Sequence, residues 1–145
     1  MKSYLLSWQF WAILSAVFAA LTAIFAKIGV QNINSDFATF IRTLVIAAFL
    51  IGILIVGKEW QPLRSITPKS YLFLVLSGLA TGASWLCYFR ALKLGNASQV
   101  APIDKLSVVL VAIFGGLFLS ENLLPLNWLG VGLIALGGVL VAYKF

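Results

Sequence analysis

Histidine is absent from this 145-residue sequence, cysteine occurs once, and charged residues make up only 10% of it. Without histidine, the chain can have neither a histidine base nor a histidine-ligated metal site. The single Cys87 excludes an internal disulfide and a cysteine-cluster metal site, and we interpret it as a helix-packing residue. We therefore expect no metal site and no cofactor.

Hydrophobic residues replace the missing charges and make up 62% of the sequence. A soluble domain is nearer half apolar and a quarter charged, so this composition predicts a membrane protein. The formal net charge is +6, but the lysines and arginines are scattered at the ends of apolar segments, where they anchor in lipid headgroups. No basic cluster occurs. This argues against a nucleic-acid partner and leaves the lipid bilayer as the expected surroundings.

Five apolar segments are each close to the roughly 20 residues that cross a bilayer as a helix. The sequence thus predicts an all-α integral membrane protein. It would have one transmembrane domain over residues 1–145, with helices over about 7–30, 36–56, 71–94, 97–120 and 127–143. Lys2 before the first segment is typical of a signal peptide. Residues 4–26, however, are charge-free over a length that exceeds the apolar region of a signal peptide, so we expect a retained helix.

Polar and aromatic side chains recur along one stripe of the third predicted helix. Steps of four, four and three residues place four of them on one helical face: Ser77, Thr81, Trp85 and Tyr88. Such a stripe suits the wall of a substrate-binding cavity, and ordinary packing with interhelical hydrogen bonds is the alternative. Further candidates for binding substrate lie on the other predicted helices: Trp11, Ser15, Arg42 and Ser107.

The fourth predicted helix holds a proline and a carboxylate at membrane depth. Pro102 removes a backbone donor past the first turn, which favours a kink or a broken turn. Asp104 lies about 10 Å from Ala97 along an ideal helix, on the same face as Ser107. A charge inside a membrane is costly and is by default a candidate functional residue.

Asp104 is expected to pair with a cation from another helix. Its neighbour Lys105 points about 100° away on a helix, since adjacent residues do not face each other. Arg42 and Arg90 reach a comparable depth from the same side of the membrane. Arg42 has two further interpretations, which the sequence leaves open: it extends to the headgroups, or it meets an anionic substrate.

The distribution of positive charge does not decide which end of the chain faces the cytoplasm. Five crossings put the termini on opposite sides, and an excess of lysine and arginine on cytoplasmic loops normally sets the orientation. The N-terminal side carries Lys2, Lys58, Arg64 and Lys69. The other side carries Lys27, Lys93 and Lys144, together with Arg42, Arg90 and Lys105 when residues inside helices are counted. We hypothesise insertion in both orientations and an antiparallel homodimer.

Two stretches make the chain similar to a known family. They are Arg90–Ile103 (RALKLGNASQVAPI) and Leu117–Leu123 (LFLSENL), supported by Ala26–Gly29 (AKIG), Arg42, Gly130, Gly137 and Gly138. With these residues the chain resembles the EamA-type members of the drug/metabolite transporter superfamily, in their short five-helix form. One departure is Ser120, which stands where the family usually has glycine.

The resemblance implies both a fold and a function. Full-length members look like two five-helix halves inserted in opposite directions, which is a recurring plan among transporters. This chain would be equivalent to one half of such a ten-helix transporter, and two antiparallel copies would rebuild the whole. The implied function is secondary transport of small organic metabolites or drugs by a multi-pass protein of the plasma membrane (the inner membrane of a prokaryote).

The energy source and the alternatives follow from what the motifs contain. No ATP-binding loop of the GxxxxGK[ST] type is present, so we expect an ion gradient or the substrate's own gradient to drive transport. Asp104 is the candidate for proton coupling. Burial disfavours a charged carboxylate and nearby cations favour it, so a carboxylate balanced in this way can exchange a proton. The alternative function is a non-transporting membrane scaffold or a subunit of a heteromeric transporter. We do not expect an enzyme, because no nucleophile–base constellation is present.

Overall fold

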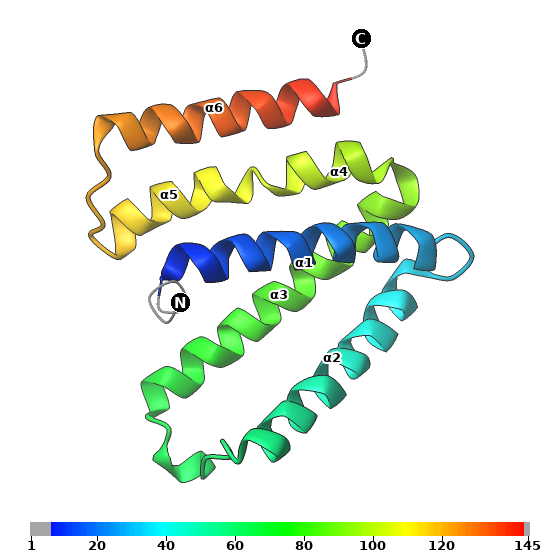
Figure 1. Cartoon of the computed structure of the whole chain (residues 1–145), viewed down its shortest axis with the longest axis vertical. Helices are drawn as coiled ribbons and strands as arrows, with labels where there is room; N and C mark the ends of the chain where they lie inside the picture. The colour runs from blue at the N-terminus through cyan, green and yellow to red at the C-terminus, as the bar shows by residue number, and fades with distance from the viewer. Residues whose placement is uncertain (1–6, 144–145) are drawn as a thin grey trace. The chain divides into compact units, whose positions relative to one another are not determined.

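The computed structural model describes residues 7–143, and all regular structure in that range is helical. In chain order it contains α1 (Trp8–Gly29), α2 (Ser35–Gly57), the short 3-10 helix η2 (Leu63–Ser65), α3 (Pro68–Leu94), α4 (Ala97–Asp104), α5 (Ser107–Phe118) and α6 (Pro125–Ala142) (Figure 1). Within the described range, five spans are long and apolar enough to cross a membrane, and α4 and α5 together form the fourth. The all-α membrane fold predicted from the sequence is confirmed. Lys2 and Lys144, which contribute to the charge distribution, lie outside the described residues.

The helices form two compact units. The first unit contains α1 up to Lys27 together with α4, α5 and α6. The second unit comprises residues 28–93 and contains α2, η2 and nearly all of α3. Each unit has hydrogen bonds and packing contacts of its own.

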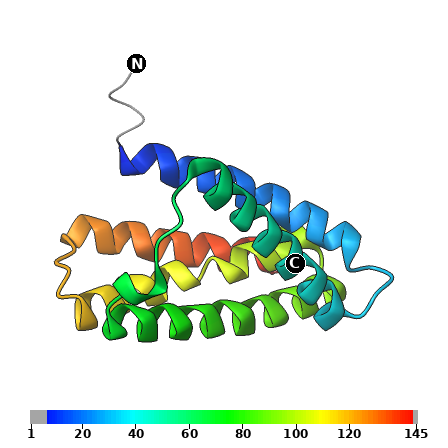
Figure 2. The ribbon, with the colours of Figure 1, turned by 90° about the horizontal axis from the view of Figure 1, so that it is seen from below.

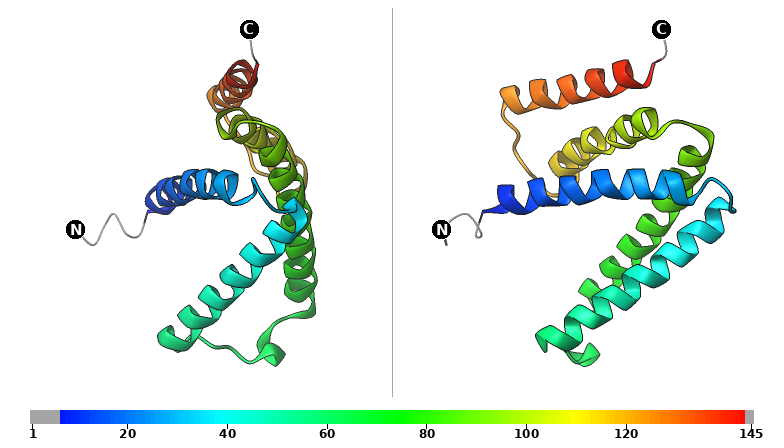
Figure 3. Two further views of the ribbon diagram at one scale, coloured as in Figure 1. Left: turned by 90° about the vertical axis from the view of Figure 1, so that its right-hand side faces the viewer. Right: turned by 45° about the vertical axis from the view of Figure 1, so that its right-hand side comes forward.

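The second unit is a hairpin of α2 and α3, whose starts are defined by short-range interactions. The side chain of Asn34 accepts hydrogen bonds from the backbone N–H groups of Asp36 (2.8 Å) and Phe37 (3.2 Å), so Asn34 is the N-cap of α2. Asp36 lies in the first turn, where the helix dipole favours a carboxylate. Pro68 begins α3, a position that suits proline because no N–H is needed there. Figure 3 shows the two ribbons spreading apart from the start of α2 towards η2.

The first unit contains the fourth span, which is interrupted after Pro102. The interval 97–120, expected to be one helix, holds α4 and α5, with Lys105 and Leu106 between them. The backbone N–H of Leu106 donates to the carbonyl of Ile103 at 3.0 Å, three residues back, instead of to the carbonyl of Pro102. Bonds over three residues mark a tightened, 3-10-like turn. The carbonyl of Pro102 is therefore outside the regular helical ladder.

α6 packs along this interrupted span and runs antiparallel to it (Figures 1 and 2). A Cβ atom added at Gly138 would lie 3.1 Å from the carbonyl oxygen of Pro102. Small residues allow helix backbones to approach closely in a membrane, and this glycine does so against α4. Gln99 adds a hydrogen bond from its Nε2 to the carbonyl of Ala142 at 3.4 Å.

The chain leaves α5 through a residue in the left-handed backbone region. Ser120 has φ = 56°, a conformation that costs energy for residues other than glycine. The backbone N–H of Glu121 then donates to the carbonyl of Gly115 at 3.1 Å. The Glu121 side chain folds back over the same glycine, since a Cβ atom added at Gly115 would lie 2.7 Å from its Oε2. The LFLSENL motif therefore forms the end of a helix.

Candidate functional site

Arg42 of α2 stacks on two aromatic rings of α3. Its guanidinium carbon Cζ lies 3.7 Å from the centre of the Trp85 ring and 5.4 Å from the centre of the Phe89 ring. Cations are attracted to aromatic faces at such distances, and the attraction strengthens where water is excluded. The second unit therefore brings together Arg42 and Trp85, both of which the sequence predicts. It adds Phe89, for which the spacing of four residues from Trp85 was the available signal.

A bidentate ion pair joins the start of α2 to the end of α3. Nε of Arg90 donates to Oδ1 of Asp36 at 3.0 Å, and Nη2 donates to Oδ2 at 2.7 Å. Two parallel bonds of this kind are stronger and more directional than a single one. The interpretation of Arg90 as a partner for Asp104 is therefore corrected, because the guanidinium of Arg90 already holds both oxygens of Asp36.

Two lysines, one in each unit, donate hydrogen bonds to backbone carbonyls in turns. Lys93, one helical turn beyond Arg90, donates from Nζ to the carbonyl of Ile33 at 2.7 Å. Within the first unit, Lys27 donates to the carbonyl of Gly95 at 2.8 Å. Lys27 belongs to the AKIG motif, and Arg90 and Lys93 belong to the RALKLG motif. In this structure they hold turns at the ends of the helices.

Asp104 ends α4, next to the interruption of the span. Its Oδ2 lies 3.3 Å from Nζ of Lys105, with the two side chains 35% and 57% exposed. The expectation that these neighbours point apart is wrong, because Lys105 lies beyond the regular helix, where the 100° spacing no longer applies. Ser107, predicted on the same face as Asp104, begins α5 and is exposed.

The remaining predicted cavity residues lie on α3 and α1. On α3, the hydroxyl of Thr81 donates to the backbone carbonyl of Ser77 at 2.8 Å, so that donor is used within the helix. Both residues are exposed, whereas Trp85 and Tyr88 are partly buried. In the first unit, Trp11 and Ser15 are exposed and one turn apart on α1; their role in a cavity, like that of the α3 stripe, stays a prediction.

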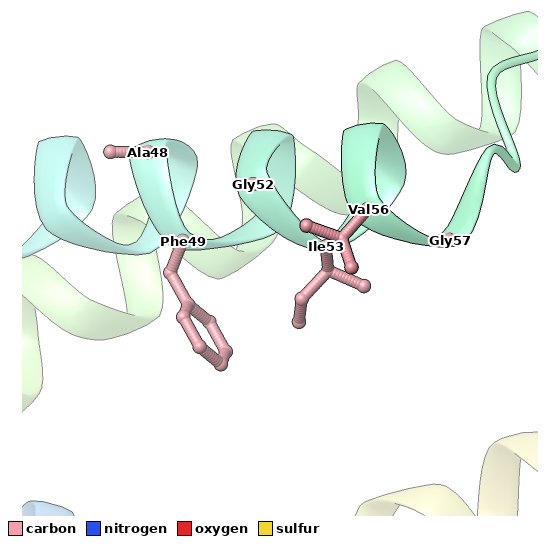
Figure 4. A pocket seen from close by; sticks show the side chains of 6 residues that line it. All are labelled: Ala48, Phe49, Gly52, Ile53, Val56 and Gly57. Carbon is pink, nitrogen blue, oxygen red and sulfur yellow. The ribbon is translucent and has the colours of Figure 1, made fainter.

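A hollow on α2 has a different character from the surroundings of Arg42. It is lined by Ala48, Phe49, Gly52, Ile53, Val56 and Gly57, all of them apolar (Figure 4). Figure 4 shows the side chains of Phe49 and Ile53 projecting from the same side of the helix. Since the lining holds no charge and none of the predicted site residues, the hollow suits a lipid chain or a neighbouring helix.

Between residues 7 and 143, no group of three or more histidine, cysteine, aspartate or glutamate side chains could hold a metal ion. The candidate chemistry that the described residues offer lies in two places. It comprises a cation on aromatic rings in the second unit, and a carboxylate next to a broken helix in the first unit.

Comparison with known proteins identifies relatives over almost the whole chain. The sequence profile of the EamA-like transporter family matches residues 6–143. An uncharacterized transporter of a Sinorhizobium species, named for its place in the cobO 3′ region, is 64% identical over 136 residues. This alignment covers 94% of this chain and 96% of that relative.

More distant relatives differ in their length. An uncharacterized transporter of Pseudomonas aeruginosa is 32% identical over 78 residues, which cover 54% of this chain but only 26% of that protein. A probable 4-amino-4-deoxy-L-arabinose-phosphoundecaprenol flippase subunit, ArnE, of Aeromonas hydrophila is 34% identical over 84 residues. These cover 58% of this chain and 68% of that protein. No solved structure matches the chain.

Proposed function

The chain belongs to the EamA-like transporter family, and we propose that it is a secondary transporter of small organic metabolites or drugs in the plasma membrane of a prokaryote. It is a multi-pass membrane protein, and its relatives are named as transporters. The observation that carries the proposal is Arg42, a permanent charge about 10 Å from the start of a membrane span that is stacked on Trp85. Ionisable residues at that depth are costly and mark substrate or ion pathways.

The proposal includes an antiparallel homodimer. Five crossings place the two termini on opposite sides of the membrane, and the positive charge does not favour one orientation. The Sinorhizobium relative is nearly covered by this chain, whereas the match to the Pseudomonas relative spans only 26% of that protein, which is therefore roughly twice as long as this chain. Short and long forms are expected if two copies of a short chain do the work of one inverted-repeat transporter.

Proton coupling is the third part of the proposal, with Asp104 as the coupling residue. Asp104 contacts Lys105 at the interruption of the fourth span. Broken helices within transporters are frequent sites for substrates and coupling ions. Protonation of Asp104 would end its attraction to Lys105, so that the occupancy of the site by a proton changes the charge next to the break.

One observation favours a second candidate function. The ArnE relative is named as a subunit of a flippase, and its alignment with this chain covers 68% of that relative. This supports the alternative in which the chain is one subunit of a heteromeric transporter. A non-transporting scaffold is the further alternative.

The experiment that tests the proposal measures topology and assembly together. A single cysteine is placed at each terminus in turn, in a Cys87→Ser background. Intact cells are then labelled with a membrane-impermeant thiol reagent, and purified protein in lipid is crosslinked. For an antiparallel homodimer we expect each terminus to be about half accessible and crosslinks to join opposite ends of the two copies.

The opposite result would leave the family assignment intact but reject the homodimer. One fixed orientation, with parallel copies or a monomer, would indicate a partner chain of opposite orientation. Copurification of the tagged chain from its native membrane would then identify that partner as the missing half.

A further inference from the structure

Arg42 is held by aromatic rings in a way that leaves its hydrogen-bonding edge unused. Stacking on Trp85 and Phe89 uses the face of the guanidinium. The five N–H donors of an arginine lie in the plane of that group and form a fork that matches a carboxylate or a phosphate. Within residues 28–93, the guanidinium of Arg42 makes no hydrogen bond. The planar edge is therefore oriented. Tyr88 is a further electrostatic neighbour of Arg42 in this unit, but no carboxylate there is paired with the guanidinium.

Neither carboxylate of the second unit can neutralise Arg42. That unit contains two, Asp36 and Glu59. Asp36 uses both of its oxygens for Arg90. Glu59 lies beyond the far end of α2, and that end, Gly57, is about 22 Å from Arg42 along the helix.

The side chain of Arg42 also does not extend towards the headgroups at the near end of α2. Its guanidinium is closer to the ring of Trp85 than to that of Phe89. Trp85 is nine residues from the end of α3 and Phe89 is five, so the guanidinium lies at the ring that is deeper in the span. An arginine that extends to the membrane surface would place its guanidinium nearer the ring of Phe89, which is closer to the end of the span.

We propose that Arg42, stacked on Trp85 and Phe89, binds the anionic group, a carboxylate or a phosphate, of the transported molecule. The inference rests on the proposed function in taking the bound anion to be the cargo. A lysine could not replace this arginine, because its compact ammonium group lacks both the flat face that stacks and the paired donors. Aromatic rings next to the anion-binding edge also suit a cargo with an apolar part.

The first test measures binding of three small aromatic probes to the purified full chain in phosphatidylcholine vesicles. Phenyl phosphate and benzoate carry a negative charge, and benzylamine carries a positive charge on a similar frame. We expect the two anions to raise the thermal unfolding temperature of the wild-type chain in a saturable way, and benzylamine to leave it unchanged.

Variants then assign the anion to Arg42. Arg42→Gln should weaken anion binding by about 10- to 100-fold, the loss expected for charge-assisted hydrogen bonds. Arg42→Lys should bind anions more weakly than the wild type although it keeps the charge, and it serves if the glutamine variant does not fold. Arg64→Gln, which removes an exposed arginine from η2, is the matched control and should bind as the wild type does.

Results of three kinds would overturn the inference. One is equal anion binding by the wild type and Arg42→Gln. Another is a response to benzylamine as large as that to the anions, or no response to either anion. The third is found in vesicles that also contain phosphatidylglycerol. If this lipid alone raises the unfolding temperature through Arg42 and abolishes the response to phenyl phosphate, the bound anion is a lipid headgroup and not cargo.

A counterflow measurement separates failure of this inference from failure of the proposed function. Vesicles loaded with unlabelled phenyl phosphate should take up the labelled compound, and Arg42→Gln should abolish the uptake. Uptake of benzylamine without dependence on Arg42 would preserve the transporter and reject the anion site. Binding of phenyl phosphate through Arg42 with no counterflow would preserve the anion site and contradict transport by this chain alone.

Discussion

The carbonyl oxygen of Pro102 on α4 lies against Gly138 on α6, at 3.1 Å from the place where a Cβ atom of that residue would be. The carbonyl is outside the helical ladder, because the N–H of Leu106 bonds to Ile103 instead. Backbone groups freed at membrane depth are tolerated only against protein or water. A glycine Cα–H can also act as a weak donor to such an oxygen. Gly138 therefore both permits the approach of α6 and covers the break.

Gly138→Ala is expected to destabilise the protein by about 1–3 kcal/mol, the range for an added group in a tightly packed contact. The added methyl group would press on a backbone carbonyl, which cannot turn aside as a flexible side chain can. Thermal unfolding of the purified chain, followed by circular dichroism, measures the effect. Gly137→Ala is the matched control, because a Cβ atom there would meet nothing within 4 Å. Equal effects of the two substitutions would show that the contact with Pro102 is unimportant.

Removal of either partner of the Asp36–Arg90 pair is expected to lower the unfolding temperature. The pair closes one end of the α2–α3 hairpin with two hydrogen bonds, and a single substitution leaves the other charge without its partner. Asp36→Asn and Arg90→Gln should together cost less than the sum of their separate effects, the signature of a direct interaction. Arg64→Gln provides the control for the loss of one positive charge. Strictly additive effects would contradict the pairing.

The parts of the structure that follow from composition and period were predictable from the sequence. The span expected over 36–56 corresponds to α2 (Ser35–Gly57), since a long apolar run flanked by polar residues has only one way to satisfy its backbone in lipid. A break in the fourth span was expected from Pro102, but its place was not predictable, because α4 continues through Pro102 and the helix is interrupted at Lys105 and Leu106.

Contacts between helices were not predictable in the same way, because they depend on how each helix is rotated about its axis. Asp36 and Arg90 are 54 residues apart, and nothing in the sequence selects Asp36 over Asp104 as the partner of Arg90. For Lys105, the assumption of a regular helix predicted the wrong direction, since the side chain follows the local break. Arg42 and Trp85 were both candidate site residues from the sequence, but the contact between them and the second ring, Phe89, were not predicted.

Ser120→Gly is expected to stabilise the protein by roughly 1 kcal/mol. Ser120 has φ = 56°, and the left-handed region costs about 1–2 kcal/mol for a residue with a Cβ atom. Part of that gain is lost because glycine has more conformational freedom in the unfolded chain. The preference of the family for glycine before Glu121 has the same physical explanation. Unfolding of Ser120→Gly and Ser120→Ala should be compared, since only glycine relieves the strain; a gain with alanine instead would contradict this explanation.

Asp104→Asn is expected to reduce proton-coupled transport far more than exchange of substrate. Asparagine keeps the size of the side chain next to Lys105 but cannot take up or release a proton. Vesicles containing a pH-sensitive dye and an imposed pH gradient report the coupling when phenyl phosphate or ethidium is added as an anionic or cationic test substrate. The wild type should dissipate the pH gradient when the probe that it transports is added. The Asp104→Asn variant should not dissipate the gradient, but it should still catalyse counterflow of the same probe.

Glu121→Gln is the control for this measurement, because Glu121 lies at the end of α5 and folds back over Gly115. If the carboxylate of Glu121 has a structural role there, its replacement by glutamine should leave the proton coupling unchanged. If Asp104→Asn dissipates the gradient as the wild type does, its contact with Lys105 is structural, since coupling would then persist without a titratable group at the break. If Glu121→Gln loses coupling and Asp104→Asn keeps it, the proton is carried at the other end of the same span.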